Sequence, residues 1–318
     1  MSVLILTDAA DATAGRVAAE LAGRGVAVHT FDPADFPVRL TLAAQIGPGG
    51  SWSGMIGGEL AIDLAAVRAV YYRKPTQFKM PEGMSGPEKL FAYSEARRGF
   101  GGVLQALADC RWVNDPVAAA RCEYKPVQLA AAAEAGLVIP PTLITSEPER
   151  AHAWASALGR PVIYKPLSGI WHADEGQIRA LYTTVVEDVG DLLDPALAHT
   201  AHLFQPQIAR AREARAVVAG STVLTVAIDS TQPGEVDWRA TYGHHRYEQI
   251  ELPGPVNDGL VRLHQRLGLL YGAADLILDA DTGAWTLLET NQGGAWGWLA
   301  DETGLPVATA LADLLQER

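Results

Sequence analysis

Three oxygen-bearing side chains lie on two consecutive apolar strands near the C-terminus. Asp275 lies in the run AADLILDA, and Glu289 and Asn291 lie two residues apart in LLETN, so the latter two point to one face of their strand. Carboxylate and amide oxygens are the hard ligands that Mg²⁺ prefers, and inward carboxylates are costly without a cation or donor. Exposure at strand ends would explain each residue singly, whereas their placement on adjacent strands favours a magnesium site.

Two lysines could hold the phosphates of a nucleotide beside such a metal. Lys165 lies in the apolar strand VIYKPL, where an ammonium group needs a partner, and Lys125 opens a helix after a turn. Each could instead cap a helix or extend its charge into water. Combined with the three oxygen donors, however, the lysines are the parts that bind a triphosphate through point charges and a bridging metal.

The elements that position these residues begin with an alternation of strand and helix patterns, as in a βαβ unit. Residues 3–6 and 26–31 are predicted strands around a helix through 17–21, and residues 47–51 (GPGGS) are predicted to form a turn between two further strands. A strand in VRAVYYRKP and a long helix over 87–110 follow. This part of the chain is expected to be of the α/β class.

Antiparallel character dominates after Lys125. An Ala-rich helix stops at Gly136, the segment GIWHADEGQ after the Lys165 strand is predicted as a mobile loop, and IRALYTTVV is predicted as the next strand. The remaining predicted elements are the strands LFQPQI, EARAVVAG, TVLTVAID, AADLILDA and WTLLETN, a helix over 260–270 and the helix LPVATALADLLQ.

The composition is that of an acidic globular protein. A chain of 318 residues predicts two or three domains. Lys plus Arg number 25 and Asp plus Glu 37, a net charge of −12 that argues against gripping nucleic acid or anionic lipid. Cys110 and Cys122 are expected to be free intracellular thiols. Neither a secretory signal nor an apolar run of about 20 residues occurs, which favours the cytoplasm.

Several common catalytic motifs are absent. There is no Walker A loop, and the turn after the first strand reads TDAADATAG instead of G-x-G-x-x-G. No G-x-S-x-G elbow surrounds a serine, which excludes the α/β-hydrolase interpretation. The pair His244-His245 has no H-E-x-x-H context, so a structural or solvated role is favoured over zinc binding.

The sequence resembles the ATP-grasp superfamily, and more closely its peptide-macrocyclising branch, the graspetide (omega-ester peptide) synthetases related to the microviridin ligases. The resemblance covers nearly the whole chain. Its marks are YYRKPT at 71–76, WVNDP at 112–116, VIYKPLSG, ALYTTVV, DWR at 237–239 and LETNQGGAWGWL at 288–299. Members of the family more often have proline after the asparagine, where this chain has Gln292, a difference that concerns the local turn and leaves the metal ligands intact.

The resemblance implies a nucleotide and metal site. Lys125 and Lys165 resemble the lysines that contact the phosphates, and Asp275, Glu289 and Asn291 resemble the magnesium ligands. The segment that contains Gln205, Gln207 and Ile208 resembles the hinge whose backbone contacts adenine. Glu213 resembles the residue that reaches the ribose.

The resemblance also implies a reacting centre. Arg215 and Arg239 resemble the arginines that stabilise the transferring phosphate and the tetrahedral intermediate. Asp237 would orient the core peptide or take the proton of the nucleophile, with an ordinary ion pair to Arg239 as the alternative. Arg73 and Lys74 are candidates for binding an acidic peptide, with surface cations at the end of a strand as the alternative.

The fold implied by the resemblance is an α/β ATP-grasp fold in three parts. These are an N-terminal Rossmann-like pre-ATP-grasp domain (1–118), a central lid domain (119–204) and a C-terminal antiparallel-sheet domain with the metal site (205–318). The implied cofactors are ATP and Mg²⁺. The implied partner is a precursor peptide with a leader and a Thr/Asp/Glu-rich core, and a homodimer is expected.

The implied activity is that of an ADP-forming carboxylate-alcohol or carboxylate-amine ligase. An Asp or Glu side chain of the peptide would be phosphorylated by ATP and then linked to Thr or Ser as an ester, or to Lys as an amide. Two alternatives stay open: a ligase acting on free amino acids or a protein tail, as the ribosomal-protein-modifying (RimK-like) ligases do, and a nucleotide-binding scaffold without turnover.

Overall fold

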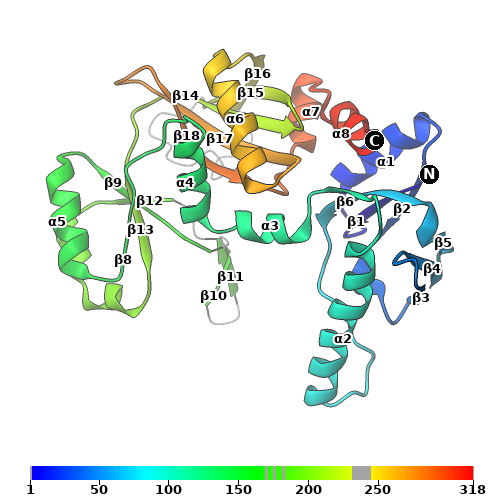
Figure 1. Cartoon of the computed structure of the whole chain (residues 1–318). Coiled ribbons are helices and arrows are strands. Elements are labelled where there is room, and N and C mark those ends of the chain that lie inside the picture. The colour runs from blue at the N-terminus through cyan, green and yellow to red at the C-terminus, as the bar shows by residue number, and fades with distance from the viewer. Residues whose placement is uncertain (1, 169–170, 175–176, 181–182, 231–244, 318) are drawn as a thin grey trace.

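The computed structural model describes residues 2–168, 171–174, 177–180, 183–230 and 245–317 (Figure 1). Within them the strands form five sheets. The expected α/β organisation is present, with a parallel sheet at the N-terminus and antiparallel sheets after it. None of the helices in these ranges combines the length and apolar character needed to cross a bilayer.

The first sheet is parallel and carries the N-terminal strand at its centre. Every residue of that strand, SVLILT, is buried, as expected for a strand covered on both faces. In sheet order the strands are β2 (Ala27–Phe31), β1 (Ser2–Thr7), β6 (Val67–Lys74) and β7 (Arg111–Val113).

Helix α1 (Ala12–Gly23) follows β1 and covers this sheet together with α8 (Val307–Gln316) from the C-terminus (Figure 1). Asp11 caps α1 by accepting hydrogen bonds from the N–H groups of Thr13 and Ala14. The buried positions of α1 recur at helical spacing, which turns one apolar stripe toward the sheet: Ala14, Val17 and Leu21.

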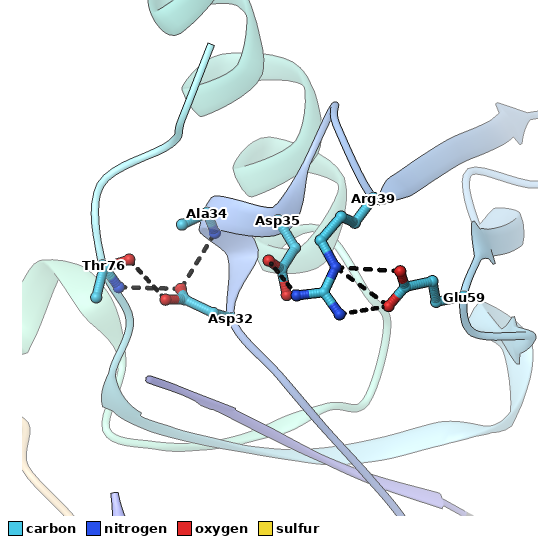
Figure 2. A network of polar contacts seen from close by, with 6 residues as sticks. All are labelled: Asp32, Ala34, Asp35, Arg39, Glu59 and Thr76. Carbon is cyan, nitrogen blue, oxygen red and sulfur yellow. Dashed lines mark hydrogen bonds and ion pairs between the residues drawn. The ribbon is translucent and has the colours of Figure 1, made fainter. Parts of the chain in front are cut away.

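A small antiparallel sheet follows β2 and η1 (Pro33–Asp35). It contains β3 (Leu40–Ile46), β4 (Trp52–Gly58) and β5 (Ile62–Asp63), so the predicted turn at 47–51 between two strands is confirmed. Figure 2 shows the polar contacts around it: Arg39 pairs with Glu59 and Asp35, while Asp32 accepts hydrogen bonds from Ala34 and from the backbone and hydroxyl of Thr76.

Helix α2 (Gly86–Gln105) starts with a capping box between Ser85 and Glu88 and projects away from the rest of the chain (Figure 1). The predicted helix over 87–110 is too long at its C-terminal end. The helix ends at Gln105 because the chain turns there, and Asp109 adopts a left-handed φ of 52°, which a helix cannot contain.

The central region is a four-stranded antiparallel sheet flanked by helix α5 (Pro148–Leu158) (Figure 1). In sheet order its strands are β12 (Thr184–Val186), β9 (Val162–Lys165), β13 (His202–Pro206) and β8 (Leu143–Thr145). The short helices η3 (Val189–Leu193) and η4 (Pro195–His199) connect β12 to β13. Helices α3 (Pro116–Cys122) and α4 (Lys125–Glu134) lead into this region.

The predicted loop after the Lys165 strand is wrong. Trp171–Asp174 forms β10 and Gln177–Ala180 forms β11, and the two strands pair antiparallel. Each strand has only four residues, so its alternation of apolar and polar residues is too short to distinguish it from the polar, glycine-bearing segment around it.

A five-stranded antiparallel sheet forms the C-terminal part, with helix α6 (Gly254–Leu267) packed on it (Figure 1). In sheet order its strands are β16 (His245–Ile250), β15 (Thr222–Ser230), β14 (Arg210–Ala219), β17 (Tyr271–Asp279) and β18 (Trp285–Asn291). Helix α7 (Gly297–Thr303) and α8 complete this part.

One apolar core joins the first sheet to the five-stranded sheet. Its buried members come from β1, β6, β14, β17 and α8, and include Val3, Tyr71, Val217, Tyr271 and Leu311. The edges of the two sheets are therefore held in fixed relation, which matters for the polar groups that lie between them.

Candidate active site

A cavity of about 800 Å³ lies between the four-stranded and five-stranded antiparallel sheets. It is lined from both sheets, by β9 and β13 on one side and by β14, β17 and β18 on the other. This volume is within the range of small-molecule and nucleotide sites. Of the expected nucleotide and metal residues, the following line it: Lys165, Gln205, Gln207, Ile208, Glu213, Asp275 and Glu289.

The two expected metal-binding carboxylates lie side by side at one end of this cavity. Asp275 on β17 pairs directly with Glu289 on β18, and Asn291 pairs with Ala273. The predicted placement of these oxygen donors on neighbouring strands is confirmed. Directly opposite residues share a face of the sheet, so the carboxylates of Asp275 and Glu289 converge.

Each carboxylate already faces a cation. Arg215 Nη1 lies 2.8 Å from Asp275 Oδ1, and Lys125 Nζ lies 2.6 Å from Glu289 Oε2. The first pair is almost fully buried, where a carboxylate would be costly without such a partner. Lys125 is the first residue of α4, so the start of that helix places its ammonium group beside β18.

The donor set fits Mg²⁺ bound together with a polyphosphate. Two carboxylates and one amide supply hard oxygen ligands, but no cluster of three His, Cys, Asp or Glu side chains suited to a metal forms within the described ranges. Mg²⁺ commonly uses one or two carboxylates and completes its shell with water and phosphate oxygens. Asp275, Glu289 and Asn291 would hold the ion on the protein side.

The opposite side of the cavity carries the expected nucleotide residues. Lys165 is a buried lysine of β9. The side chain of Gln205 is buried and donates from Nε2 to the hydroxyl of Thr142 at 2.9 Å, while its Oε1 meets no hydrogen-bond donor in the described parts of the chain. A buried amide oxygen beside a cavity is suited to accept a hydrogen bond from a ligand.

The backbone that follows β13 offers a ligand fewer free hydrogen-bonding groups than expected. Gln207 donates its N–H to Pro161 O at 2.8 Å, so only its carbonyl can face the cavity. Ile208 follows it in the cavity wall. Glu213 is buried in the cavity wall and forms an ion pair of 2.6 Å with Arg210, which also lines the cavity. Arg210 was not among the residues expected from the sequence.

Arg73 and Lys74 lie at the end of β6, near the turn that follows β18, and only Arg73 is buried. Arg73 is only 4% exposed, so it is not the surface cation that was the alternative expectation. Its Nε lies 3.1 Å from Asp11 Oδ2, and its Nη1 donates to the carbonyl of Gly293. Arg73 thus ties the first sheet to the turn that follows β18.

Lys74 is exposed, and within the described residues its ammonium group has no hydrogen-bond or ion-pair partner. The pKa of Lys74 is lowered, first by partial burial of the side chain and then by the positive charge of Arg73; Asp11 opposes this shift, and Arg215 adds a smaller lowering. An anion bound at its exposed ammonium group would offset the repulsion from Arg73.

Asp237 and Arg239, the other two expected catalytic residues, lie outside the described residues. Sequence reasoning also missed Asn114, which is 1% exposed and bridges the first sheet to β17 and to the turn after β18. The motif WVNDP contains it, and a polar residue that directly follows an apolar strand was the available signal.

A buried histidine of α6 contacts β18 on the side that packs against this helix. His264 on α6 contacts Leu260 O through Nδ1 at 2.8 Å and Thr290 Oγ1 through Nε2 at 3.0 Å. Thr290 lies between Glu289 and Asn291. Burial lowers the pKa of His264 to about 4, although the Leu260 carbonyl opposes that shift. The ring is therefore neutral at physiological pH.

Comparison with known proteins agrees with this geometry. Residues 2–120 match the family model of the MvdD pre-ATP grasp domain. A search of curated protein sequences gave no match.

Three solved structures are similar over almost the whole chain. A RiPP-associated ATP-grasp ligase from Chryseobacterium gregarium, in complex with ADP and a leader and core peptide, has 25% identity and a TM-score of 0.88, covering 99% of this chain and 96% of that one. The macrocyclase MdnC from Microcystis aeruginosa MRC, bound with precursor peptide MdnA, has 27% identity and a TM-score of 0.84, covering 99% of both chains. The macrocyclase MdnB from the same organism has 28% identity and a TM-score of 0.81, covering 100% of this chain and 99% of that one.

These matches extend over both the first sheet and the antiparallel sheets that follow it. The chain therefore has the ATP-grasp fold of the RiPP-associated ligases, and its residues 2–120 match the MvdD pre-ATP grasp domain.

Proposed function

We propose that the protein is an ATP-dependent macrocyclase of a ribosomally made precursor peptide. It would activate Asp or Glu side chains as acyl phosphates and link them to Thr or Ser as esters, or to Lys as amides. The observation that carries this proposal is the cavity of nucleotide size that ends at the Asp275–Glu289 pair. It lies in a chain that matches, over its full length, ligases solved with ADP and peptide.

The nucleotide would lie between the two antiparallel sheets. Gln205, Gln207 and Ile208 would face the base, and Glu213 the ribose. Lys165 would contact the phosphates from the cavity wall on β9, and Lys125, at the start of α4, would reach them from beside Glu289.

The metal would bind where the phosphates reach β17 and β18, held by Asp275, Glu289 and Asn291. When bound, Mg²⁺ supplies charge neutralisation on the transferring phosphoryl group. Lys125 can move from Glu289 to a phosphate oxygen, since its long side chain carries the charge on a flexible stem.

The first chemical step joins a side-chain carboxylate oxygen of the peptide to the γ-phosphorus of ATP and breaks the bond to the β-phosphate oxygen, releasing ADP. In the second step a hydroxyl or amine attacks the acyl carbon, inorganic phosphate leaves and the nucleophile loses its proton. Arg215 lies beside Asp275, where it would stabilise charge on the transferring group, and Arg239 would act with it. Asp237 would orient the core peptide or accept the proton.

Lys74 is the proposed anchor for a carboxylate of the peptide. It is exposed at the end of β6 and is subject to the positive charge of Arg73 and Arg215. Arg73 would support this position from behind, since its guanidinium is buried against Asp11 and Gly293. The partner would be a precursor peptide with a leader and a Thr/Asp/Glu-rich core, acted on by a homodimer.

The test is to incubate the protein with ATP, Mg²⁺ and a candidate acidic precursor peptide encoded beside its gene, and to weigh the peptide by mass spectrometry. We expect loss of one water for each linkage, with ADP formed in step. A mass gain from an added amino acid would replace this proposal with a ligase of the protein-tail type, and binding of ATP without any ADP would indicate a scaffold.

Glu289→Gln is the matched variant for the metal assignment. The substitution keeps the size of the side chain and removes the charge that the metal needs, so we expect turnover to fall by at least about 100-fold, the typical loss for one such electrostatic group. Retention of full activity would exclude Glu289 as a metal ligand.

A further inference from the structure

The turn that follows β18 is held by side-chain hydrogen bonds to three consecutive backbone carbonyl groups. Asn291, the last residue of β18, begins a β-turn closed by a hydrogen bond of 3.1 Å from Gly294 N to Asn291 O. The next three carbonyls, those of residues 292, 293 and 294, accept side-chain hydrogen bonds from Asn114, Arg73 and Tyr271 respectively.

Two of these donors come from the pre-ATP-grasp domain. Asn114, which follows β7, donates from Nδ2 to Gln292 O at 2.9 Å, and Arg73, on β6, donates from Nη1 to Gly293 O. The third, Tyr271 at the start of β17, donates its hydroxyl to Gly294 O at 2.5 Å. We call these three side chains the carbonyl clamp.

Asn114 is fixed by its own hydrogen bonds. Its Nδ2 also donates to Tyr271 O at 2.7 Å, and its Oδ1 accepts from the N–H groups of Leu270 and Tyr271 at 2.8 and 2.9 Å. Both ends of the amide are thus occupied, and the side chain is almost completely buried. A buried amide satisfied at both ends has one orientation, so it transmits the position of β7 to Gln292.

Close packing adds to the clamp at Gly294. A Cβ atom there would lie 2.5 Å from Ala273 Cβ and 2.8 Å from Arg215 Nη2. The turn therefore approaches β17 and Arg215 as closely as a main chain can.

The residue at 292 does not by itself restrict the backbone of the turn. A proline at this position would fix its own φ, whereas Gln292 is free to rotate. In this chain the rigidity of the turn comes from the side chains that surround it.

We propose that Asn114, Arg73 and Tyr271 are positioning residues that hold Asn291 and Glu289 in the geometry that binds the metal-nucleotide. This inference rests on the metal ligands of the proposed function. The pre-ATP-grasp domain then contributes to the metal site through the backbone of the turn, without itself supplying a ligand. Groups that orient metal ligands typically change metal affinity by about 10- to 100-fold when removed.

The test measures two affinities of the purified full chain by calorimetry. One is the affinity for Mg²⁺ at saturating ADP, and the other is the affinity for ADP with EDTA present. For Asn114→Ala we expect Mg²⁺ affinity to fall about 10-fold or more while ADP affinity in EDTA stays unchanged. Tyr271→Phe removes a single hydroxyl, keeps the fold and should lower Mg²⁺ affinity in the same way.

Asp32→Ala is the control for a general loss of stability. It removes hydrogen bonds to Ala34 and Thr76 in the same domain and touches no part of the turn (Figure 2). We expect both affinities of this variant to match the wild type. The clamp is refuted if Tyr271→Phe and Asn114→Ala bind Mg²⁺ within twofold of the wild type, or if Asp32→Ala weakens Mg²⁺ binding as much as they do.

Glu289→Gln separates this inference from the metal assignment. If Glu289→Gln weakens Mg²⁺ binding and the clamp variants do not, the ligands stand and the clamp is refuted. If Glu289→Gln binds Mg²⁺ as the wild type does, the metal assignment of the proposed function is wrong, and the clamp falls with it.

Discussion

Protonation of His264 is expected to destabilise the fold around β18. The ring lies between α6 and β18 and is 1% exposed. In the neutral tautomer that fits its contacts, Nδ1–H donates to Leu260 O and Nε2 accepts from the hydroxyl of Thr290. A proton on Nε2 would place a charge in the core, with only the hydroxyl oxygen of Thr290 to accept its hydrogen bond.

The magnitude follows from the pKa of His264, which burial lowers from 6.5 to about 4. Above the unfolded value both states are neutral, and between the two values only the unfolded state binds the proton. The free energy of unfolding therefore decreases as the pH falls through this window, and the decrease is complete below the folded value. A difference of about 2.5 pKa units corresponds to roughly 3 kcal/mol.

Urea unfolding of the wild type and of His264→Gln between about pH 7 and pH 4 would measure this effect. Carboxylates titrate in both proteins, so the informative quantity is the difference between their pH dependences. The wild type should lose roughly 3 kcal/mol more than the variant across the window. His199→Gln, which removes an exposed imidazole, should retain the wild-type pH dependence.

Parallel pH dependences of the wild type and His264→Gln would refute the reasoning. So would an NMR titration in which the His264 ring protonates near its ordinary pKa, because the ring could then not be as isolated from water as the packing indicates.

Two further substitutions act where the first domain meets the five-stranded sheet. Gly294→Ala should lower the free energy of unfolding by about 1–3 kcal/mol, because its Cβ would overlap Ala273 and Arg215; thermal denaturation would show this. Asp11→Ala should cost about 3–5 kcal/mol in urea unfolding, because it leaves the buried guanidinium of Arg73 without its carboxylate and also removes the cap of α1.

Each of these has a close control. At Gly293 a Cβ would lie 3.4 Å from its nearest neighbour, so Gly293→Ala should be tolerated better than the change at 294, and an equal loss would contradict the packing argument.

Asp11→Asn keeps a capping oxygen and removes the charge, so it isolates the ion pair. A loss of only about 1 kcal/mol for Asp11→Ala, the value of a cap alone, would show that the ion pair adds nothing.

The sequence was sufficient for features that depend on local pattern. The buried strand SVLILT, the turn at 47–51 and the paired carboxylates on the last two strands all follow from apolar periodicity and from the cost of inward charge. The hairpin at 171–180 was missed because each of its strands has only four residues, too few for their alternation to stand out within a glycine-bearing polar segment.

Contacts between distant segments could not be predicted in this way. The ion pair between Arg73 and Asp11, and the hydrogen bonds from Asn114 to Gln292, join residues separated by 62 and 178 positions. No periodicity encodes such pairs, since they depend on how the first sheet is docked onto the last one. For this reason Arg73 could be placed beside an acidic peptide in the sequence interpretation, whereas it is buried in the structure.

The ion pair between Lys125 and Glu289 has a consequence for how the site fills. The ammonium group lies 2.6 Å from the carboxylate oxygen that a divalent ion would use, so a bare metal ion competes with a cation that the chain itself supplies. A metal ion that arrives with a polyphosphate meets no such competition, because the phosphate offers the lysine a new anion as the carboxylate is released. If Glu289 is a metal ligand, as proposed, the pair would disfavour divalent ions alone and would couple occupancy of the metal site to the arrival of nucleotide.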